Sequence, residues 1–65
     1  MNLRTILNKA SKKLKKNNIK TFKIDSEILL ANTINKDRKH IILNFNEQIK
    51  KLYLKKFNEL IDTFD

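Results

Sequence analysis

The stretch of sequence that decides the fold covers residues 22–34 and reads FKIDSEILLANTI. On a helix of about 3.6 residues per turn, its apolar side chains point in almost every direction rather than along one stripe. These apolar residues are Ile24, Ile28, Leu29, Leu30, Ala31 and Ile34. A helix with this pattern is covered by neighbours on several sides, so we predict that it is the central helix of the fold. Thr21 is the expected N-cap, and Asp25 in the first turn complements the helix dipole.

An amphipathic helix is predicted on the N-terminal side of this stretch, over about residues 3–16. Its apolar residues follow the spacing i, i+3, i+4, i+7 and i+11, which places them on a single stripe. They are Leu3, Ile6, Leu7, Ala10 and Leu14. Asn2 can cap the start of this helix, and Asn18 can take the left-handed conformation at its end.

Two more helices are predicted on the C-terminal side. Asp37 is the expected N-cap of a short helix over about residues 38–44, and a last helix covers about residues 50–63. The buried stripe of the last helix is expected to contain Tyr53, Phe57, Leu60, Ile61 and Phe64. Because apolar and polar residues do not alternate with a period of two anywhere, no strand is expected. The predicted fold is therefore all-α, a small orthogonal or irregular bundle of about four helices in a single domain over residues 1–65.

The helical pattern also predicts a core and one ion pair. The side chains expected in the core are Leu7, Leu14, Ile28, Leu29, Leu30, Ile42, Phe57 and Leu60. Arg38 lies just inside a predicted helix start, where a cation opposes the helix dipole. We therefore expect Arg38 to bind a carboxylate elsewhere, and Asp25 is the proposed partner.

The composition excludes most kinds of catalytic site. The chain has 65 residues and contains no Gly, Pro, Cys or Trp. Glycine-rich phosphate loops and nucleophile elbows need glycine backbone, and thiolate zinc sites and disulfides need cysteine. His40 is the single histidine and has no metal-ligand spacing around it, so a structural or surface role is expected. No leader or membrane-spanning segment is recognisable, which favours a cytoplasmic protein that binds neither membrane nor metal.

The positive charge has two interpretations. Fifteen Lys and Arg oppose seven Asp and Glu, which gives a formal net charge of +8. Such a balance attracts polyanions, and a candidate partner-binding surface is formed by the residues Lys9, Lys12, Lys13 and Lys16. The alternative is a solvated helix face whose lysines reflect an A/T-rich genome, since asparagine and isoleucine are each present nine times as well.

The sequence resembles a known family over essentially all of its 65 residues. The pattern Asp25-x-Glu27-x-Leu29-Leu30, followed by Lys36-Asp37-Arg38, is similar to the N-terminal helical domain of HemK/PrmC. These proteins are the peptide chain release factor N5-glutamine methyltransferases. The family usually has glycine where this chain has Asn18 and Asn35, and asparagine is the next-best residue for a left-handed helix end. The family's Ser or Thr cap of the last helix is replaced by Lys50.

The resemblance implies a recognition domain that is not catalytic on its own. The family's catalytic domain carries a glycine-rich S-adenosylmethionine loop and an Asn-Pro-Pro-Tyr motif, and this chain has neither glycine nor proline. No cofactor is therefore expected in this chain, and S-adenosylmethionine would bind in the other domain. The implied partners are a peptide chain release factor and the methyltransferase domain in cis, with the domain itself a monomer.

Two other functions stay open from the residues alone. The chain is expected, as one alternative, to be a free-standing small basic protein that binds nucleic acid through the lysines of its first helix. As another, it is a folding unit that packs on a methyltransferase domain. Exposure of Leu52 and Phe45 would favour that second alternative, because exposed apolar side chains indicate a missing partner.

Overall fold

The computed structural model describes residues 1–63, which form four helices joined by short connections. The helices are α1 (Leu3–Lys16), α2 (Phe22–Thr33), α3 (Arg38–Leu43) and α4 (Lys51–Asp62). No strand occurs within residues 1–63, where the backbone pairs in sheet fashion only at an isolated bridge between Asn2 and Gln48. The predicted all-α class is confirmed, and each helix begins and ends within one residue of its predicted bounds.

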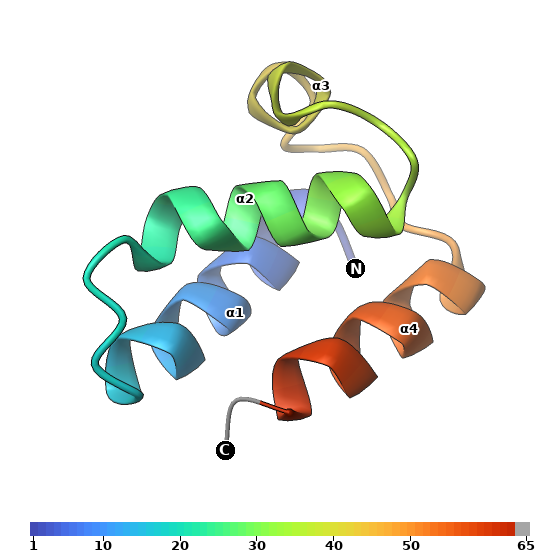
Figure 1. Cartoon of the computed structure of the whole chain (residues 1–65). Helices are drawn as coiled ribbons and strands as arrows, with labels where there is room; N and C mark the ends of the chain where they lie inside the picture. Colours follow the sequence, from blue (N-terminus) through green and yellow to red (C-terminus); the bar gives the residue numbers. More distant parts are fainter. Residues whose placement is uncertain (64–65) are drawn as a thin grey trace.

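Helix α2 is the central element of the fold. It packs against α1, α3 and α4. Figure 1 shows α1 and α4 together on one side of α2, while α3 lies over its opposite side. The prediction that residues 22–34 form the central helix is confirmed, because the other three helices all rest on this one.

Local capping explains where α1 and α3 begin. The side-chain oxygen of Asn2 accepts a hydrogen bond of 2.9 Å from the amide of Thr5, and that of Asp37 accepts one of 2.8 Å from the amide of His40. Both residues satisfy a backbone donor that the first turn of a helix leaves unpaired. Helix α4 begins at Lys51, and its N-cap residue Lys50 makes no side-chain cap, as the missing Ser or Thr predicts.

The chain leaves α1 and α2 through the same left-handed turn. Asn18 has φ 64° and Asn35 has φ 60°. The amide of Ile19 bonds the carbonyl of Leu14 at 3.1 Å, and the amide of Lys36 bonds the carbonyl of Ala31 at 2.9 Å. These bonds close a Schellman motif at each helix end, which is the conformation expected of the two asparagines.

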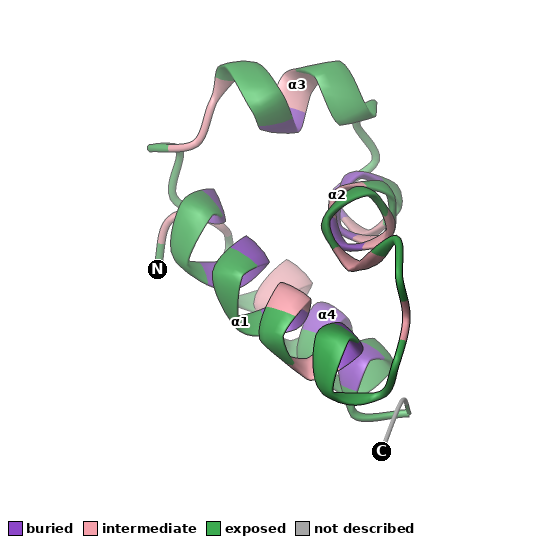
Figure 2. Ribbon diagram, turned by 90° about the vertical axis from the view of Figure 1, so that its left-hand side faces the viewer, coloured by how far each residue is buried: buried purple, intermediate pink, exposed green. Residues whose placement is uncertain are grey.

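The core lies where the helices face one another, as the buried residues in Figure 2 show. The stripe of α1 is buried as predicted. Of the predicted core, Leu7, Leu14, Leu30 and Phe57 are buried, and Leu29 is half-buried and packs against the core. The predicted buried residue Phe64 lies outside the described residues.

Three of the predicted core residues are exposed instead. The exposed fractions are 42% for Ile28, 40% for Ile42 and 37% for Leu60. Three helices cover α2, and Ile28 lies one turn from the exposed Ile24 on the side that none of them covers. In the six-residue α3, Ile41 alone is buried, which leaves Ile42 at the surface, while in α4 Phe57 and Ile61 take the buried positions beside Leu60.

The predicted ion pair between Asp25 and Arg38 is wrong. Arg38 binds Glu27, with Nη2 3.1 Å and Nε 3.2 Å from Oε1. Residues two apart on a helix point about 200° away from each other, so only one of the two carboxylates can face α3. Asp25 instead accepts a hydrogen bond of 2.9 Å from the hydroxyl of Thr21. Thr21 occupies the N-cap position of α2, as expected, but its side chain caps no backbone amide.

Candidate partner-binding surface

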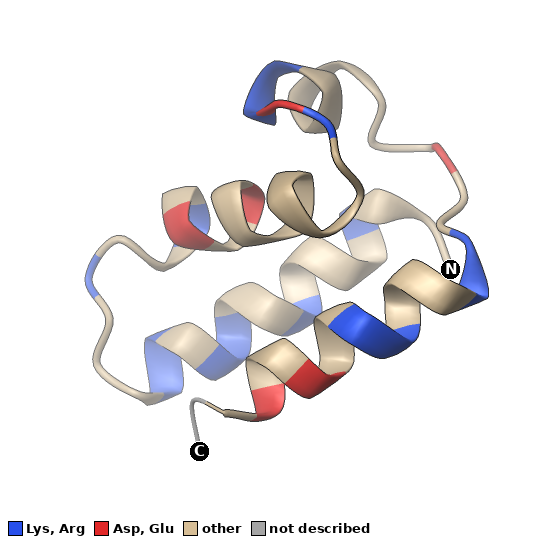
Figure 3. Cartoon of the chain, turned by 45° about the vertical axis from the view of Figure 1, so that its right-hand side comes forward, with Lys and Arg blue, Asp and Glu red and all other residues tan. Residues whose placement is uncertain are grey.

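The four candidate lysines occupy one face of α1. Lys9, Lys12, Lys13 and Lys16 follow the spacing i, i+3, i+4 and i+7, so they stand beside one another along the helix. Lys9, Lys12 and Lys16 are exposed, and Lys13 is half-buried. Figure 3 shows Lys and Arg residues along the length of α1. The sequence therefore predicted a continuous basic face, and the structure places all four lysines on it.

Lys13 differs from the other three because it ties α1 to α4. Its Nζ lies 2.9 Å from Oδ1 of Asp62, the last residue of α4. The side chain of Lys13 is 24% exposed and that of Asp62 is 71% exposed, so water screens the pair from one side. Lys13 thus has a structural role that the lysine spacing does not reveal.

A groove separates α1 from α4. The two helices lie side by side on α2 (Figure 1). The groove has a volume of about 320 Å³, and its floor is apolar. The floor residues are Ile6 and Ala10 of α1 and Phe57 and Ile61 of α4. We refer to this feature as the α1–α4 groove.

The edges of the α1–α4 groove are polar. Lys9 and Lys13 line it from α1, while Asn58 and Asp62 line it from α4. Met1 and Leu54 complete the lining. No pattern in the sequence predicts this groove, because its existence depends on how far apart α2 holds the other two helices.

The α4 edge carries lysines as well. Lys51, Lys55, Asn58 and Asp62 follow the spacing i, i+4, i+7 and i+11, which puts them on one row of α4. Since Asn58 and Asp62 line the groove, Lys51 and Lys55 continue its edge toward the start of the helix. Figure 3 shows this division, with basic residues in the first half of α4 and acidic residues in the second.

His40 takes part in a contact away from this surface. Its Nε2 lies 3.1 Å from Oε2 of Glu47, which joins α3 to the segment before α4. Within residues 1–63, no three His, Cys, Asp or Glu side chains are grouped so that they could hold a metal ion. None of the helices described is long and apolar enough to cross a membrane. The contact between His40 and Glu47 therefore links α3 to the segment before α4 at the surface of the domain.

Among the described aromatic side chains, none is exposed. Phe22, Phe45 and Tyr53 are half-buried and Phe57 is buried. Lys15 lies over the ring of Phe22, with Nζ 5.7 Å from its centroid. Of the two residues whose exposure would favour contact with a further domain, Leu52 is 61% exposed, whereas Phe45 packs against the core.

Comparison with known proteins identifies the family. The family described as the PrmC N-terminal domain matches residues 5–64 of this chain. A bifunctional methyltransferase from Rickettsia felis (strain ATCC VR-1525 / URRWXCal2) is 32% identical over 60 residues. That alignment covers 92% of this chain but only 11% of the Rickettsia protein. No solved structure matches the chain.

The match runs through all four helices, from the first turn of α1 to beyond the end of α4. It includes the central helix and the Lys36-Asp37-Arg38 segment on which the resemblance rested. The chain belongs to the family of PrmC N-terminal domains.

Proposed function

We propose that this domain docks a peptide chain release factor for a methyltransferase domain that modifies it. The observation that carries the proposal is the family match, which occupies residues 5–64 and so accounts for nearly the whole chain. The α1–α4 groove supports a binding role, because it combines an apolar floor with Lys9 at its edge and further exposed lysines beside it on α1. Such a surface is suited to a protein partner.

Methyl transfer itself belongs, in this proposal, to another domain. The chain has no glycine and no proline, so it lacks the glycine-rich loop and the Asn-Pro-Pro-Tyr motif that the HemK/PrmC resemblance implies for S-adenosylmethionine and catalysis. The Rickettsia relative is named a methyltransferase, and the matched part is 11% of its length. Both observations support a recognition domain that is not an enzyme alone.

A binding measurement tests this function. The 65-residue domain is titrated with a peptide chain release factor from the same organism in an isothermal calorimeter, and saturable binding with one site per domain is expected. A parallel assay with labelled S-adenosylmethionine is expected to show no methyl transfer by the domain alone. No binding at the highest soluble concentrations would reject the docking role, and methyl transfer would reject the non-catalytic assignment.

A further inference from the structure

We propose that the α1–α4 groove binds an acidic, amphipathic segment of the partner protein. This inference rests on the proposed function and deepens it, because it assigns the docking surface and the chemistry of the segment that occupies it. Three properties of the groove carry the inference: its floor, the charge of its two edges, and the kinds of side chain that it presents.

The floor of the groove accepts apolar side chains. Ile6, Ala10, Phe57 and Ile61 form it, and all four belong to the buried core of the domain. An apolar side chain placed there extends the core outward rather than starting a new contact in water. Met1 lies at the surface beside this floor, and its flexible thioether side chain can adapt to what enters.

Both edges of the groove attract negative charge. Lys9 is exposed and lines the groove from α1, and the exposed Lys12 and Lys16 neighbour it on the same helix. On α4, the exposed Lys51 and Lys55 lie on the same row as the lining residues Asn58 and Asp62. Asp62 is the carboxylate that lines the groove, and it is bound to Lys13. Glu59 lies one row further out on α4, away from the lining. A segment with acidic residues flanking its apolar ones would therefore match the floor and both edges at once.

The side chains of the surface favour a protein segment over nucleic acid. The exposed cations at the groove and next to it are all lysines, whereas arginine is the residue that makes bidentate contacts to phosphates and bases. No aromatic side chain among residues 1–63 is exposed to stack on a base. A phosphate backbone has no apolar groups that could contact the floor of the groove. A peptide helix with apolar residues at helical spacing does have such groups.

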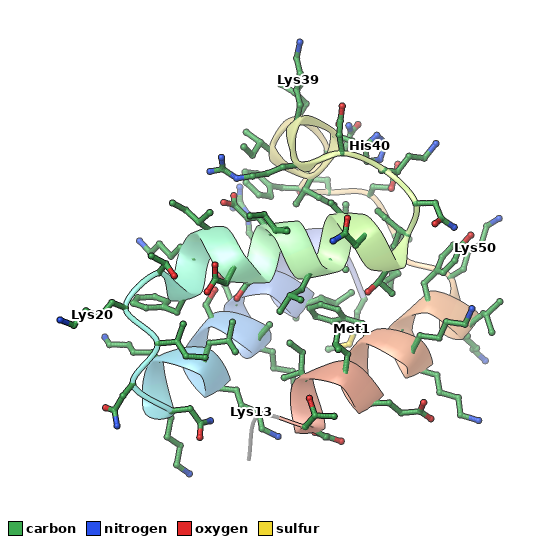
Figure 4. The ribbon with its side chains drawn as sticks, viewed as in Figure 1. Met1, Lys13, Lys20, Lys39, His40 and Lys50 are labelled. Carbon is green, nitrogen blue, oxygen red and sulfur yellow. The ribbon has the colours of Figure 1, made fainter. Side chains whose placement is uncertain are left out.

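Charge reversal with a matched control tests the role of the edges. The variant Lys9→Glu/Lys12→Glu/Lys16→Glu reverses the charge of Lys9, which lines the groove, and of its neighbours Lys12 and Lys16 on α1. The control Lys20→Glu/Lys36→Glu/Lys39→Glu makes the same change in net charge at exposed positions outside the groove lining. Figure 4 shows Lys20 and Lys39 pointing away from the rest of the domain, while Lys13 reaches toward the end of α4. Circular dichroism checks that both variants fold.

Binding of the release factor to each variant is then measured by calorimetry. The groove variant is expected to bind at least about tenfold more weakly, and the control to change by less than about threefold. Raising the salt concentration is expected to weaken wild-type binding and to leave the groove variant nearly unaffected. A Lys9→Gln/Lys12→Gln/Lys16→Gln variant gives the same comparison without added negative charge, should the reversed variant not fold.

A second pair of variants tests the floor without changing charge. Asn58→Trp places a large side chain at the groove edge, and Asn32→Trp places the same side chain on the exposed side of α2. The first is expected to weaken binding by at least about fivefold and the second to leave it unchanged.

The outcomes separate the two proposals. If the wild-type domain binds the release factor but the groove variants and controls behave alike, the groove proposal is wrong and the docking function stands. If the wild-type domain does not bind, the docking function is wrong and the groove proposal falls with it. A single-stranded RNA 20-mer that displaces the release factor at equal concentration would also overturn the proposal of an acidic protein segment.

Discussion

Lys13 and Asp62 join the far ends of α1 and α4, with 2.9 Å between Nζ and Oδ1, across the edge of the groove that separates the two helices. Both helices rest on α2, and this contact fixes one end of the space between them. The ion pair between Lys13 and Asp62 therefore bounds the groove at one end. Met1 and Leu54 also line the groove.

Removing this tie should cost little stability. Asp62→Asn is expected to lower the free energy of unfolding by less than about 1 kcal/mol, because the Asp62 carboxylate is mostly exposed and its charge is screened. Urea unfolding at low and high salt measures the effect, and the difference between variant and wild type should shrink as salt increases. A loss of more than about 2 kcal/mol would show that the pair contributes as a buried one does.

The identity of the carboxylate that binds Arg38 can be measured by double-mutant cycles. The cycle of Glu27→Gln with Arg38→Gln is expected to give a coupling energy of about 0.5–1 kcal/mol, since Glu27 is the half-buried member of the pair. The cycle of Asp25→Asn with Arg38→Gln is expected to give a coupling near zero. Equal coupling in the two cycles would contradict the observed pairing.

Substitution of Asn18 and Asn35, which both have a left-handed backbone conformation, can stabilise the domain. Asn18→Gly and Asn35→Gly are each expected to raise the free energy of unfolding by up to about 1 kcal/mol, because glycine has no Cβ to oppose the positive φ. Asn18→Ala should lower it by about 1 kcal/mol for the opposite reason. Asn8→Gly, inside α1, serves as the control and should be destabilising. Thermal unfolding gives the order of the four variants.

Two neighbouring apolar residues of α2 should differ sharply in their contribution. Leu30→Ala is expected to cost about 2–5 kcal/mol, because Leu30 is fully buried and its loss leaves a cavity. Ile28→Ala should cost less than about 1 kcal/mol, because that side chain is exposed. At this size, about 1 kcal/mol corresponds to a shift in Tm of about 4–8 °C. A similar Tm for the two variants would contradict the placement of α2.

The parts of the fold that sequence predicted well depend on local interactions. Asn2 and Asp37 cap helices within three residues of themselves, and the apolar stripe of α1 is a property of one helix. The left-handed conformations of Asn18 and Asn35 follow from backbone sterics alone. Helix bounds could therefore be predicted within a residue without knowledge of how the helices pack.

The parts that sequence missed depend on the positions of other helices. Ile28 and Leu60 are apolar and helical, but their burial is decided by whether a neighbour covers that side. The choice of Glu27 over Asp25 is decided by where α3 crosses α2. The four lysines of α1 could be predicted as a face, whereas the groove beside them requires the separation of α1 from α4.

The segment before α4 has a consequence for how the chain folds. Its carbonyls at Phe45 and Glu47 each accept a hydrogen bond of 3.0 Å, from the amides of Arg4 and Leu3, and the amide of Ile49 donates one of 3.1 Å to the carbonyl of Met1. The opening turn of α1 is thus completed by residues that leave the ribosome much later than it does. Until they arrive, that turn has unpaired donors and should fray, so closing this long loop is the non-local step of folding.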